Sequence, residues 1–244
     1  MTIRIILLCL VIMCGHACAY SQVYTTYRFN KKIKREVELF PDSNMAHVVF
    51  YYPDGSKSVD AWYNNDTLHG KTIEWYKSGQ IKLMGNYKRG LRSGKWKYWY
   101  SNGKIQSQQY FVNGQPDDWY FSWYSNGNMK EKGYYVSGKP EGEWKEWYSN
   151  GSIREEGKCK WGQKEGLWVE YYMNSREHRQ TYYIGGVPYT ETIFFWSNGK
   201  LDVASQRELE RIINLPESDR TEGEKVLLKH NMKYFRRDSR PSIP

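Results

Sequence analysis

Cysteine is nearly missing from this sequence. Three of the four cysteines, Cys9, Cys14 and Cys18, fall close to the amino end, and Cys159 stands alone in the remainder. A single thiol cannot form an internal bridge, which excludes a disulfide framework. Stability must therefore come from packing and strand pairing.

The sequence also lacks the patterns that carry catalysis or metal binding. No nucleophile elbow, phosphate loop or His-Glu metal motif is present. The carboxylates of Asp117 and Asp118 are expected in a turn, and those of Glu155 and Glu156 on opposite faces of a strand, so neither pair suits general acid–base catalysis. The four histidines that follow the amino-terminal stretch are far apart, and none lies at ligand spacing to another: His47, His69, His178 and His230. We therefore expect a non-enzymatic protein with no cofactor and no metal.

No apolar run is long enough to cross a bilayer. The longest, Ile5–Met13, follows an arginine and precedes small residues that end at Ala19, which is the plan of a secretory signal. We expect cleavage after Ala19, or as a second choice after Ser21, and no transmembrane segment thereafter. Lipidation of Cys18 is a competing interpretation, because a small residue precedes it as in a lipobox. The expected location is periplasmic, outer-membrane-associated or secreted.

The composition is basic and aromatic. The formal net charge is +9, and Trp, Tyr and Phe make up 17% of the chain, a composition that favours strands or binding surfaces. A basic balance suits anionic partners such as lipid headgroups or acidic polysaccharide, although the charge is spread along the chain and also serves solubility. Export argues against nucleic acid as the partner.

A 24-residue repeat organises the sequence from 46 to 201. Its clearest column is a glycine that recurs every 24 residues or a multiple of it, with a serine filling one gap, which defines seven copies without insertion or deletion. The members of this column are Gly55, Gly79, Gly103, Gly127, Gly151, Ser175 and Gly199.

Each copy predicts a β-hairpin, because Asn-Gly between aromatic runs is the strongest short-range hairpin signal. Taking Asn102-Gly103 as a two-residue type I′ loop pairs Tyr100 with Ile105, Tyr98 with Ser107 and Trp96 with Gln109. The same register sets Trp144 opposite Gly157 and Trp168 opposite Thr181, where an indole protects bare backbone. The structural turn residues are Asn102, Gly103, Asn126, Gly127, Asn150 and Gly151.

An even period returns each column to the same side of the sheet. The face that carries Trp96, Tyr76, Tyr124 and Tyr148 is expected to be the packed side. The opposite face is the candidate binding face, or alternatively a surface buried against a neighbouring hairpin or subunit. Its residues are Trp75, Trp99, Trp123, Trp147, Lys97, Lys145, Lys130, Tyr110 and Tyr134.

The expected fold is all-β, an elongated single-layer antiparallel meander of seven hairpins with a short helical cap at the carboxyl end. Residues 1–19 are the signal, 20–45 an amino-terminal cap with a strand over 23–29, 46–201 the repeat array, and 202–244 the helical cap and tail. A capping-box pattern at Ser205–Glu208 predicts a helix toward Leu215, and a second helix is expected over 222–234.

The repeat resembles the bacterial variant of the MORN repeat. The segments GKWKYWYSNG at 94–103 and GEWKEWYSNG at 142–151 are similar to its G-x-W-x-x-W-Y-x-N-G core. Bacterial proteins with such repeats are often labelled YwqK-like antitoxin components, a label that fits poorly with an export signal. The resemblance implies a sheet of hairpins that binds lipid or protein partners and supplies no catalytic residues.

Three functions follow from these observations. The preferred hypothesis is an exported scaffold for protein–protein interaction at the cell envelope. The first alternative is a module that binds cell-surface or cell-wall glycan through an exposed tryptophan stripe. The second is an antitoxin-like partner that neutralises a toxin.

Overall fold

A computed structural model describes residues 6–11, 20–27 and 32–238. The chain forms two compact units, residues 1–127 and 128–244. The expected signal falls partly on strand β1 (Ile6–Val11), which pairs antiparallel with β2 (Tyr20–Tyr27) in the uncleaved chain. Cys18 and the cleavage site at Ala19 lie outside the described residues, so processing and lipidation stay predictions.

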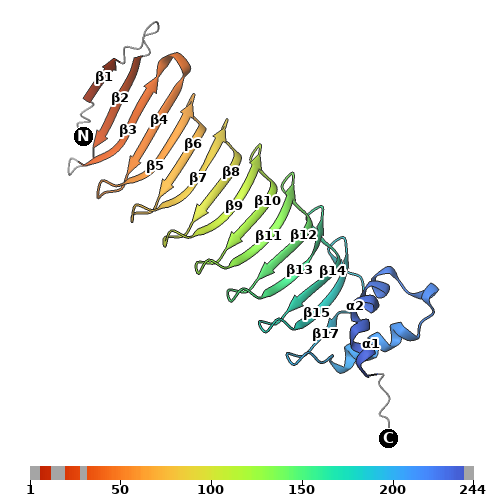
Figure 1. Cartoon of the computed structure of the whole chain (residues 1–244). Coiled ribbons are helices and arrows are strands. Elements are labelled where there is room, and N and C mark those ends of the chain that lie inside the picture. Colours follow the sequence, from red (N-terminus) through yellow and green to blue (C-terminus); the bar gives the residue numbers. More distant parts are fainter. Residues whose placement is uncertain (1–5, 12–19, 28–31, 239–244) are drawn as a thin grey trace. The chain divides into compact units, whose positions relative to one another are not determined.

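Unit 1 is an open antiparallel sheet in which each strand bonds to the next in chain order (Figure 1). The amino-terminal cap is thus built from strands, with a short 3-10 turn over Pro41–Ser43. After β1 and β2 come β3 (Ile33–Phe40), β4 (Met45–Tyr51), β5 (Lys57–Asn64), β6 (Thr67–Trp75), β7 (Ile81–Lys88), β8 (Leu91–Trp99), β9 (Ile105–Val112) and β10 (Gln115–Trp123).

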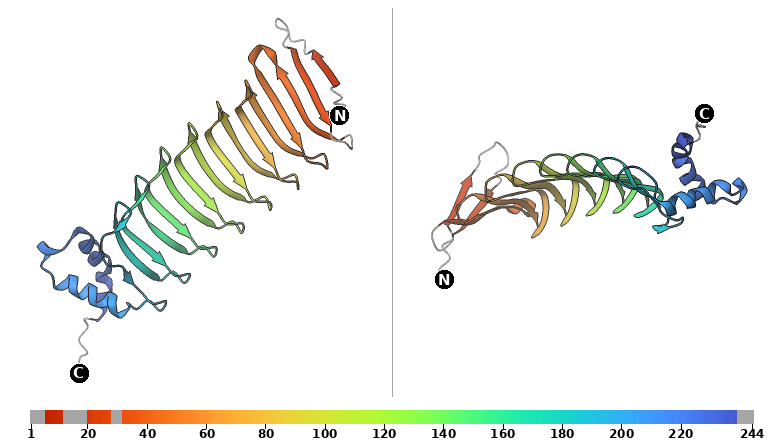
Figure 2. Two further views of the ribbon diagram at one scale, coloured as in Figure 1. Left: turned by 180° about the vertical axis from the view of Figure 1, so that it is seen from behind. Right: turned by 90° about the horizontal axis from the view of Figure 1, so that it is seen from below.

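Unit 2 continues the same pattern and adds helices at its carboxyl end, coloured blue in Figure 2. The chain is thereby an all-β antiparallel meander with a short helical part, as the repeat predicts. Its elements are β11 (Met129–Val136), β12 (Lys139–Trp147), β13 (Ile153–Lys160), β14 (Gln163–Tyr171), β15 (Glu177–Ile184), β16 (Val187–Pro188), β17 (Ile193–Phe194), α1 (Val203–Asn214), a 3-10 turn (Glu217–Asp219) and α2 (Glu222–Asp238).

The seventh copy departs from the expected full hairpin. Its turn is kept, since the N–H of Gly199 donates to the carbonyl of Trp196 at 2.7 Å. Its second strand, however, shrinks to a single bridge between Phe195 and Leu201 before α1 begins at Val203. The repeat array therefore ends in a truncated copy that passes directly into the helices.

The Asn-Gly turns are of a different type from the one predicted. In the third copy the N–H of Gly103 donates to the carbonyl of Tyr100, and the N–H of Tyr100 to the carbonyl of Lys104, both at 2.9 Å. Positive φ occurs at Gly103 (+81°), and Asn102 is not among the described residues with positive φ. This pattern is a type I turn closed by a glycine bulge. The Asn102 side-chain oxygen accepts the N–H of Lys104 at 3.1 Å instead.

The bulge also corrects one predicted pair. Trp99 pairs with Ile105, whereas Tyr100 was expected there. Farther from the turn the predicted register is confirmed, with Trp96 opposite Gln109 and Tyr98 opposite Ser107. One extra residue in the turn therefore changes only the pair beside it.

Type I′ turns do occur in this fold, at the connections from one copy to the next. Asn113 and Gly114 have φ of 50° and 81°, and Arg89 and Gly90 have φ of 52° and 78°. Two positive φ values in succession match the right-handed twist of the flanking strands. The two turn types therefore alternate along the chain, with the bulged turns within copies and the type I′ turns between them.

Large indoles cover glycines, as expected, but the glycines belong to the preceding strand. The sheet pairs Trp144 with Gly157 and Trp168 with Thr181, which confirms the register. A Cβ at Gly133, however, would lie 2.0 Å from the Trp144 ring, and a Cβ at Gly157 would lie 2.3 Å from the Trp168 ring. Each indole thus reaches back over the neighbouring hairpin and joins two copies.

The tyrosine column also joins copies. The hydroxyls of Tyr76 and Tyr100 donate to the carbonyls of Trp99 and Trp123, at 2.7 and 2.8 Å, and the Tyr148 hydroxyl donates likewise in unit 2. These tyrosines were expected to serve only as core. Their hydroxyls instead bond the backbone of the next copy, so the column fixes the spacing between copies.

Five apolar side chains make the core of the helical part, of which Phe195 is 2% exposed. Ile193, Leu209, Ile212 and Leu227 are completely buried, and α2 packs on strands β14 and β15. At the same junction the Nδ2 of Asn231 donates to the Gln180 side chain at 2.6 Å. The helices therefore cover part of one sheet face in unit 2.

The helix starts use different caps from the one predicted. Helix α1 begins after Asp202, whose carboxylate accepts the N–H of Ser205 at 2.9 Å, three residues before the expected start. Helix α2 begins with a capping box, since Glu224 N–H donates to the Thr221 hydroxyl at 3.2 Å and Thr221 N–H to the Glu224 carboxylate at 2.8 Å.

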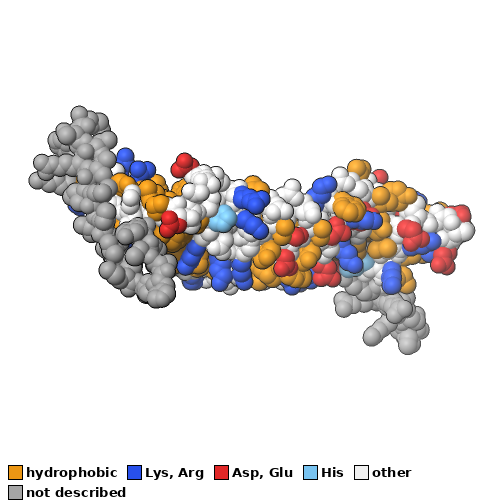
Figure 3. All heavy atoms as spheres, turned by 90° about the horizontal axis from the view of Figure 1, so that it is seen from above, with side chains coloured by type: hydrophobic (Ala, Val, Ile, Leu, Met, Phe, Trp, Pro, Cys, Tyr) orange, Lys and Arg blue, Asp and Glu red, His pale blue; other side chains and the backbone are white. Residues whose placement is uncertain are grey.

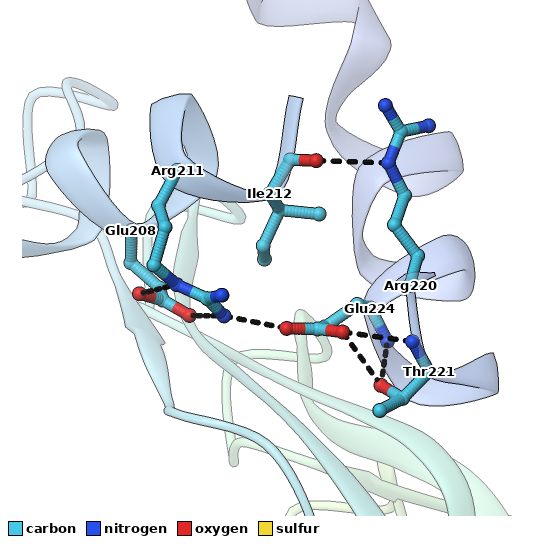
Figure 4. A network of polar contacts seen from close by, with 6 residues as sticks. All are labelled: Glu208, Arg211, Ile212, Arg220, Thr221 and Glu224. Carbon is cyan, nitrogen blue, oxygen red and sulfur yellow. Dashed lines mark hydrogen bonds and ion pairs between the residues drawn. The ribbon is translucent and has the colours of Figure 1, made fainter. Parts of the chain in front are cut away.

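Arginines tie the two helices together (Figure 4). Arg211 forms ion pairs with Glu208 of α1 and with Glu224 of α2. Arg220 donates to the Ile212 carbonyl at 2.8 Å, at the end of α1. Orphan carbonyls at a helix end are commonly satisfied in this way.

Replacing Gly103 by Val should lower the free energy of unfolding by about 1–3 kcal/mol, because a β-branched residue resists a positive φ. The matched control is Gly103→Asn, since asparagine tolerates this conformation better. Thermal melts followed by circular dichroism measure both variants. Equal stability of Gly103→Val and the parent would contradict the placement of Gly103 at a positive φ in the turn.

Candidate ligand-binding face

The candidate binding face of unit 1 is built by the sheet register. Cross-strand partners lie on the same side, and the row that includes Lys97 runs through Ile73 on β6, Met84 on β7, Gln108 on β9 and Phe121 on β10. We call the side of unit 1 that carries this row the tryptophan face.

The predicted residues of this face are only partly exposed. Trp75, Trp99 and Trp123 recur two strands apart and are each half-buried, as is Lys97. Tyr110 is the most open of the predicted set in unit 1, with 41% of its surface exposed. The tryptophan column is therefore a series of separate, partly exposed rings and not a continuous exposed stripe.

Two further members of the face, Trp119 and Phe121, are not predicted by the repeat columns. Together with Trp123 they follow one another along strand β10, with ring centroids 5.9 and 6.1 Å apart and planes inclined by 22° and 26°. Trp119 is 43% exposed. This aromatic row runs along a strand, whereas the predicted stripe runs across strands.

The predicted residues of unit 2 differ from those of unit 1 in their contacts and exposure. Lys145 forms an ion pair with Glu156 at 2.7 Å, Trp147 and Tyr134 are half-buried, and Lys130 is exposed. Each of these residues lies in unit 2, and they form a separate set from those of unit 1.

Unit 2 has a hollow of about 420 Å³ where α2 meets the sheet. It is lined by Lys145, Glu156, Leu167, Tyr182 and Val226, among others. Two of its charged groups, Lys145 and Glu156, form an ion pair with each other at 2.7 Å, and the hollow lies where the helix packs on the sheet.

The carboxylate of Glu156 is held in its charged form. Partial burial alone would raise its pKa, but hydrogen bonds from Lys145 and from the Tyr171 hydroxyl, at 2.7 Å, lower the pKa of Glu156 below its ordinary value. The same hydrogen bond raises the pKa of Lys145. The pair is therefore ionised across the neutral range.

Acid should weaken unit 2 through this pair. A lowered carboxyl pKa in the fold contributes stability above the unfolded value, and that contribution is lost as the pH falls through the folded value. The parent should lose more stability than Glu156→Gln between about pH 6 and about pH 3. Urea unfolding midpoints at both pH values measure this difference, and equal losses would contradict the role of the pair.

The described ranges hold neither a metal cluster nor a membrane-spanning helix. There is no group of three or more His, Cys, Asp or Glu side chains placed to hold a metal ion in that part of the chain. The helices of the described residues are also too short or too polar to cross a membrane. Figure 3, a view of one face, shows basic and hydrophobic side chains exposed side by side.

Comparison with known proteins agrees with this architecture. Four segments match the model of the MORN repeat variant, over residues 68–89, 92–113, 120–137 and 140–158. No curated protein matches the chain. MORN repeats are in general modules that interact with proteins or membranes. The chain therefore contains MORN-type repeats, and the matched ones lie between residues 68 and 158.

Proposed function

We propose that this protein is an exported, non-catalytic scaffold that mediates protein–protein interaction at the cell envelope. The observation that carries the proposal is the exposed apolar end of the sheet in unit 2. Phe194 and Trp196 of the truncated seventh copy are 41% and 60% exposed, and Val203 at the start of α1 is 66% exposed.

The strand order of unit 2 adds to this argument. Beyond β15 the sheet offers only two-residue strands, β16 and β17. The backbone of Phe194 at this edge is already bonded, since its N–H donates to the Ser205 hydroxyl at 2.8 Å and its carbonyl accepts the N–H of Asp202 at 3.1 Å, so a partner would dock on side chains. Exposed apolar side chains beside such an edge supply the burial that holds a protein partner.

Partner capture tests the scaffold. A photo-crosslinker placed at Ser197 of the full chain should capture a protein in the envelope, and Phe194→Ser with Trp196→Ser should abolish the capture. The matched control is Trp161→Ser, which removes a tryptophan that is 68% exposed in a turn of unit 2. Capture that survives the double substitution would refute this docking end, and a toxin as the captured protein would make the scaffold antitoxin-like.

Export is supported by the sequence of the first 21 residues. Mass spectrometry of the protein from cells should find a chain that begins at Tyr20, or at Gln22 with the alternative cleavage. A full-length chain in the cytoplasmic fraction would refute export. A lipid-modified Cys18 at the new amino end would establish the lipoprotein alternative.

A glycan-binding module is the second candidate function. The aromatic row of Trp119, Phe121 and Trp123 favours it, because near-parallel and partly exposed rings offer apolar surface to the faces of sugar rings. Retention of the full chain on immobilised cell-wall polysaccharide, lost in Trp119→Ala, tests this function.

A further inference from the structure

We propose that the tryptophan face of unit 1 binds an acidic polysaccharide, with uronate carboxylates held by lysines beside the aromatic row. The inference rests on the glycan-binding candidate function and names its ligand class. Its elements are the lysines of β8, the neutral side chains opposite them, and the rings of β10.

The segment from 75 to 116 carries only positively charged side chains. It contains no Asp or Glu and holds eight basic residues: Lys77, Lys82, Lys88, Arg89, Arg92, Lys95, Lys97 and Lys104. The segment spans β7, β8 and β9, which pair in that order and lead to β10. A positive field therefore borders the aromatic row, and such a field draws anions toward it.

The lysines of the tryptophan face have neutral partners. The register sets Lys97 between Met84 and Gln108, and Lys95 opposite Tyr110. Neither lysine forms an ion pair with any residue in the described part of unit 1. Their ammonium groups are thus available to an external anion.

The repeat supplies an internal comparison. Lys145 and Glu156 of unit 2 occupy the positions of Lys97 and Gln108, 48 residues farther along. There the lysine is neutralised by the carboxylate at 2.7 Å. The lysine at this position of the repeat is therefore paired with a carboxylate in unit 2, whereas in unit 1 its charge is not compensated by an ion pair.

Lysines and rings lie within reach of one ligand. The row that contains Lys97 continues through Gln108 directly to Phe121, and the row that contains Lys95 continues through Tyr110 to Asp117. Adjacent strands are about 4.8 Å apart, so two strand steps place the backbones of β8 and β10 about 10 Å apart, within the reach of their long side chains. An extended chain that carries a carboxylate on each sugar ring fits both features. Asp117 ends the row that contains Lys95, so its carboxylate repels an anionic ligand there and favours the Phe121 side.

The test measures binding of the full chain by calorimetry to polygalacturonate oligomers and to neutral galactan oligomers of equal length. A thymidine oligonucleotide of equal charge is the third ligand. The key variant is Lys95→Gln with Lys97→Gln, and the matched control is Lys139→Gln with Lys160→Gln, two exposed lysines of unit 2. Circular dichroism verifies that each variant is folded.

We expect polygalacturonate to bind more tightly than galactan, with an affinity that falls as salt rises. The key variant should lose about tenfold in affinity for polygalacturonate, and the control should match the parent. Equal affinity for the two glycans, or an unchanged key variant, would overturn the acidic ligand and leave glycan binding intact. Absence of binding to both glycans would overturn both proposals, and tighter binding of the oligonucleotide would replace glycan by nucleic acid.

Discussion

Replacing Trp96 by alanine should lower the free energy of unfolding of unit 1 by about 3–5 kcal/mol, the range for removing a buried aromatic ring. Trp96 is completely buried, and a Cβ at Gly85 would lie 2.2 Å from its ring. The ring meets Tyr87 edge-on at 4.9 Å, and its Nε1 donates to the Asn86 carbonyl at 3.1 Å. The substitution removes packing between two hairpins and leaves that carbonyl without its donor.

Urea unfolding followed by far-ultraviolet circular dichroism measures this loss. The matched control is Trp161→Ala, because that ring is 68% exposed and its removal should change stability by less than about 0.5 kcal/mol. The comparison holds residue type constant and changes only burial. Similar midpoints for Trp96→Ala and Trp161→Ala would show that the indole does not join the hairpins.

Replacing Leu227 by alanine should lower the free energy of unfolding of unit 2 by about 2–5 kcal/mol. Leu227 is completely buried in a cluster with Ile193, Leu209 and Ile212. Because β17 is only two residues long, its Ile193 depends on this cluster for burial. Loss of the leucine should therefore loosen both helices and the last strand.

Hydrogen exchange measures the local effect, and urea unfolding measures its size. Amides of α1, α2 and β17 should exchange faster in Leu227→Ala, while those of β13 keep more of their protection. Lys229→Ala, an exposed change on the same helix, is the control. Unchanged exchange of α1 in Leu227→Ala would contradict a shared core.

The sequence periodicity predicts the fold well because burial and the two-residue alternation of strands act at every copy. The pairs Trp96 with Gln109 and Trp144 with Gly157 follow from counting alone. What counting does not reveal is the conformation of the turn. Type I′ and bulged type I turns both accept Asn-Gly, and the hydrogen bond from Tyr100 to Lys104 decides between them.

The reach of the indoles was also beyond sequence reasoning. Gly142 has a φ of +74° in an irregular stretch of β12, where the register shifts against β11. That shift carries Trp144 over Gly133, although its direct partner in the sheet is Gly157. Only the backbone path shows which glycine the ring covers.

The candidate site was predicted in part. Columns between copies identify Lys97 and Tyr110 on the tryptophan face, but a search for residues shared by copies overlooks what a single copy has alone. Trp119 and Phe121 occur on β10 where the other copies have lysine, glutamate, histidine or aliphatic residues. Alternating aromatics at 119, 121 and 123 were the signal that would have found the row.

The strand register is the claim on which the faces, the site and the proposals depend. Interstrand backbone nuclear Overhauser effects in unit 1 test it most directly. This register predicts cross-strand contacts between the backbones of Lys97 and Gln108 and of Gln108 and Phe121. Contacts that pair Lys97 with Gln109 instead would shift the register by one residue and place Lys97 and Phe121 on opposite faces of the sheet. That result would contradict the tryptophan face and the site built on it.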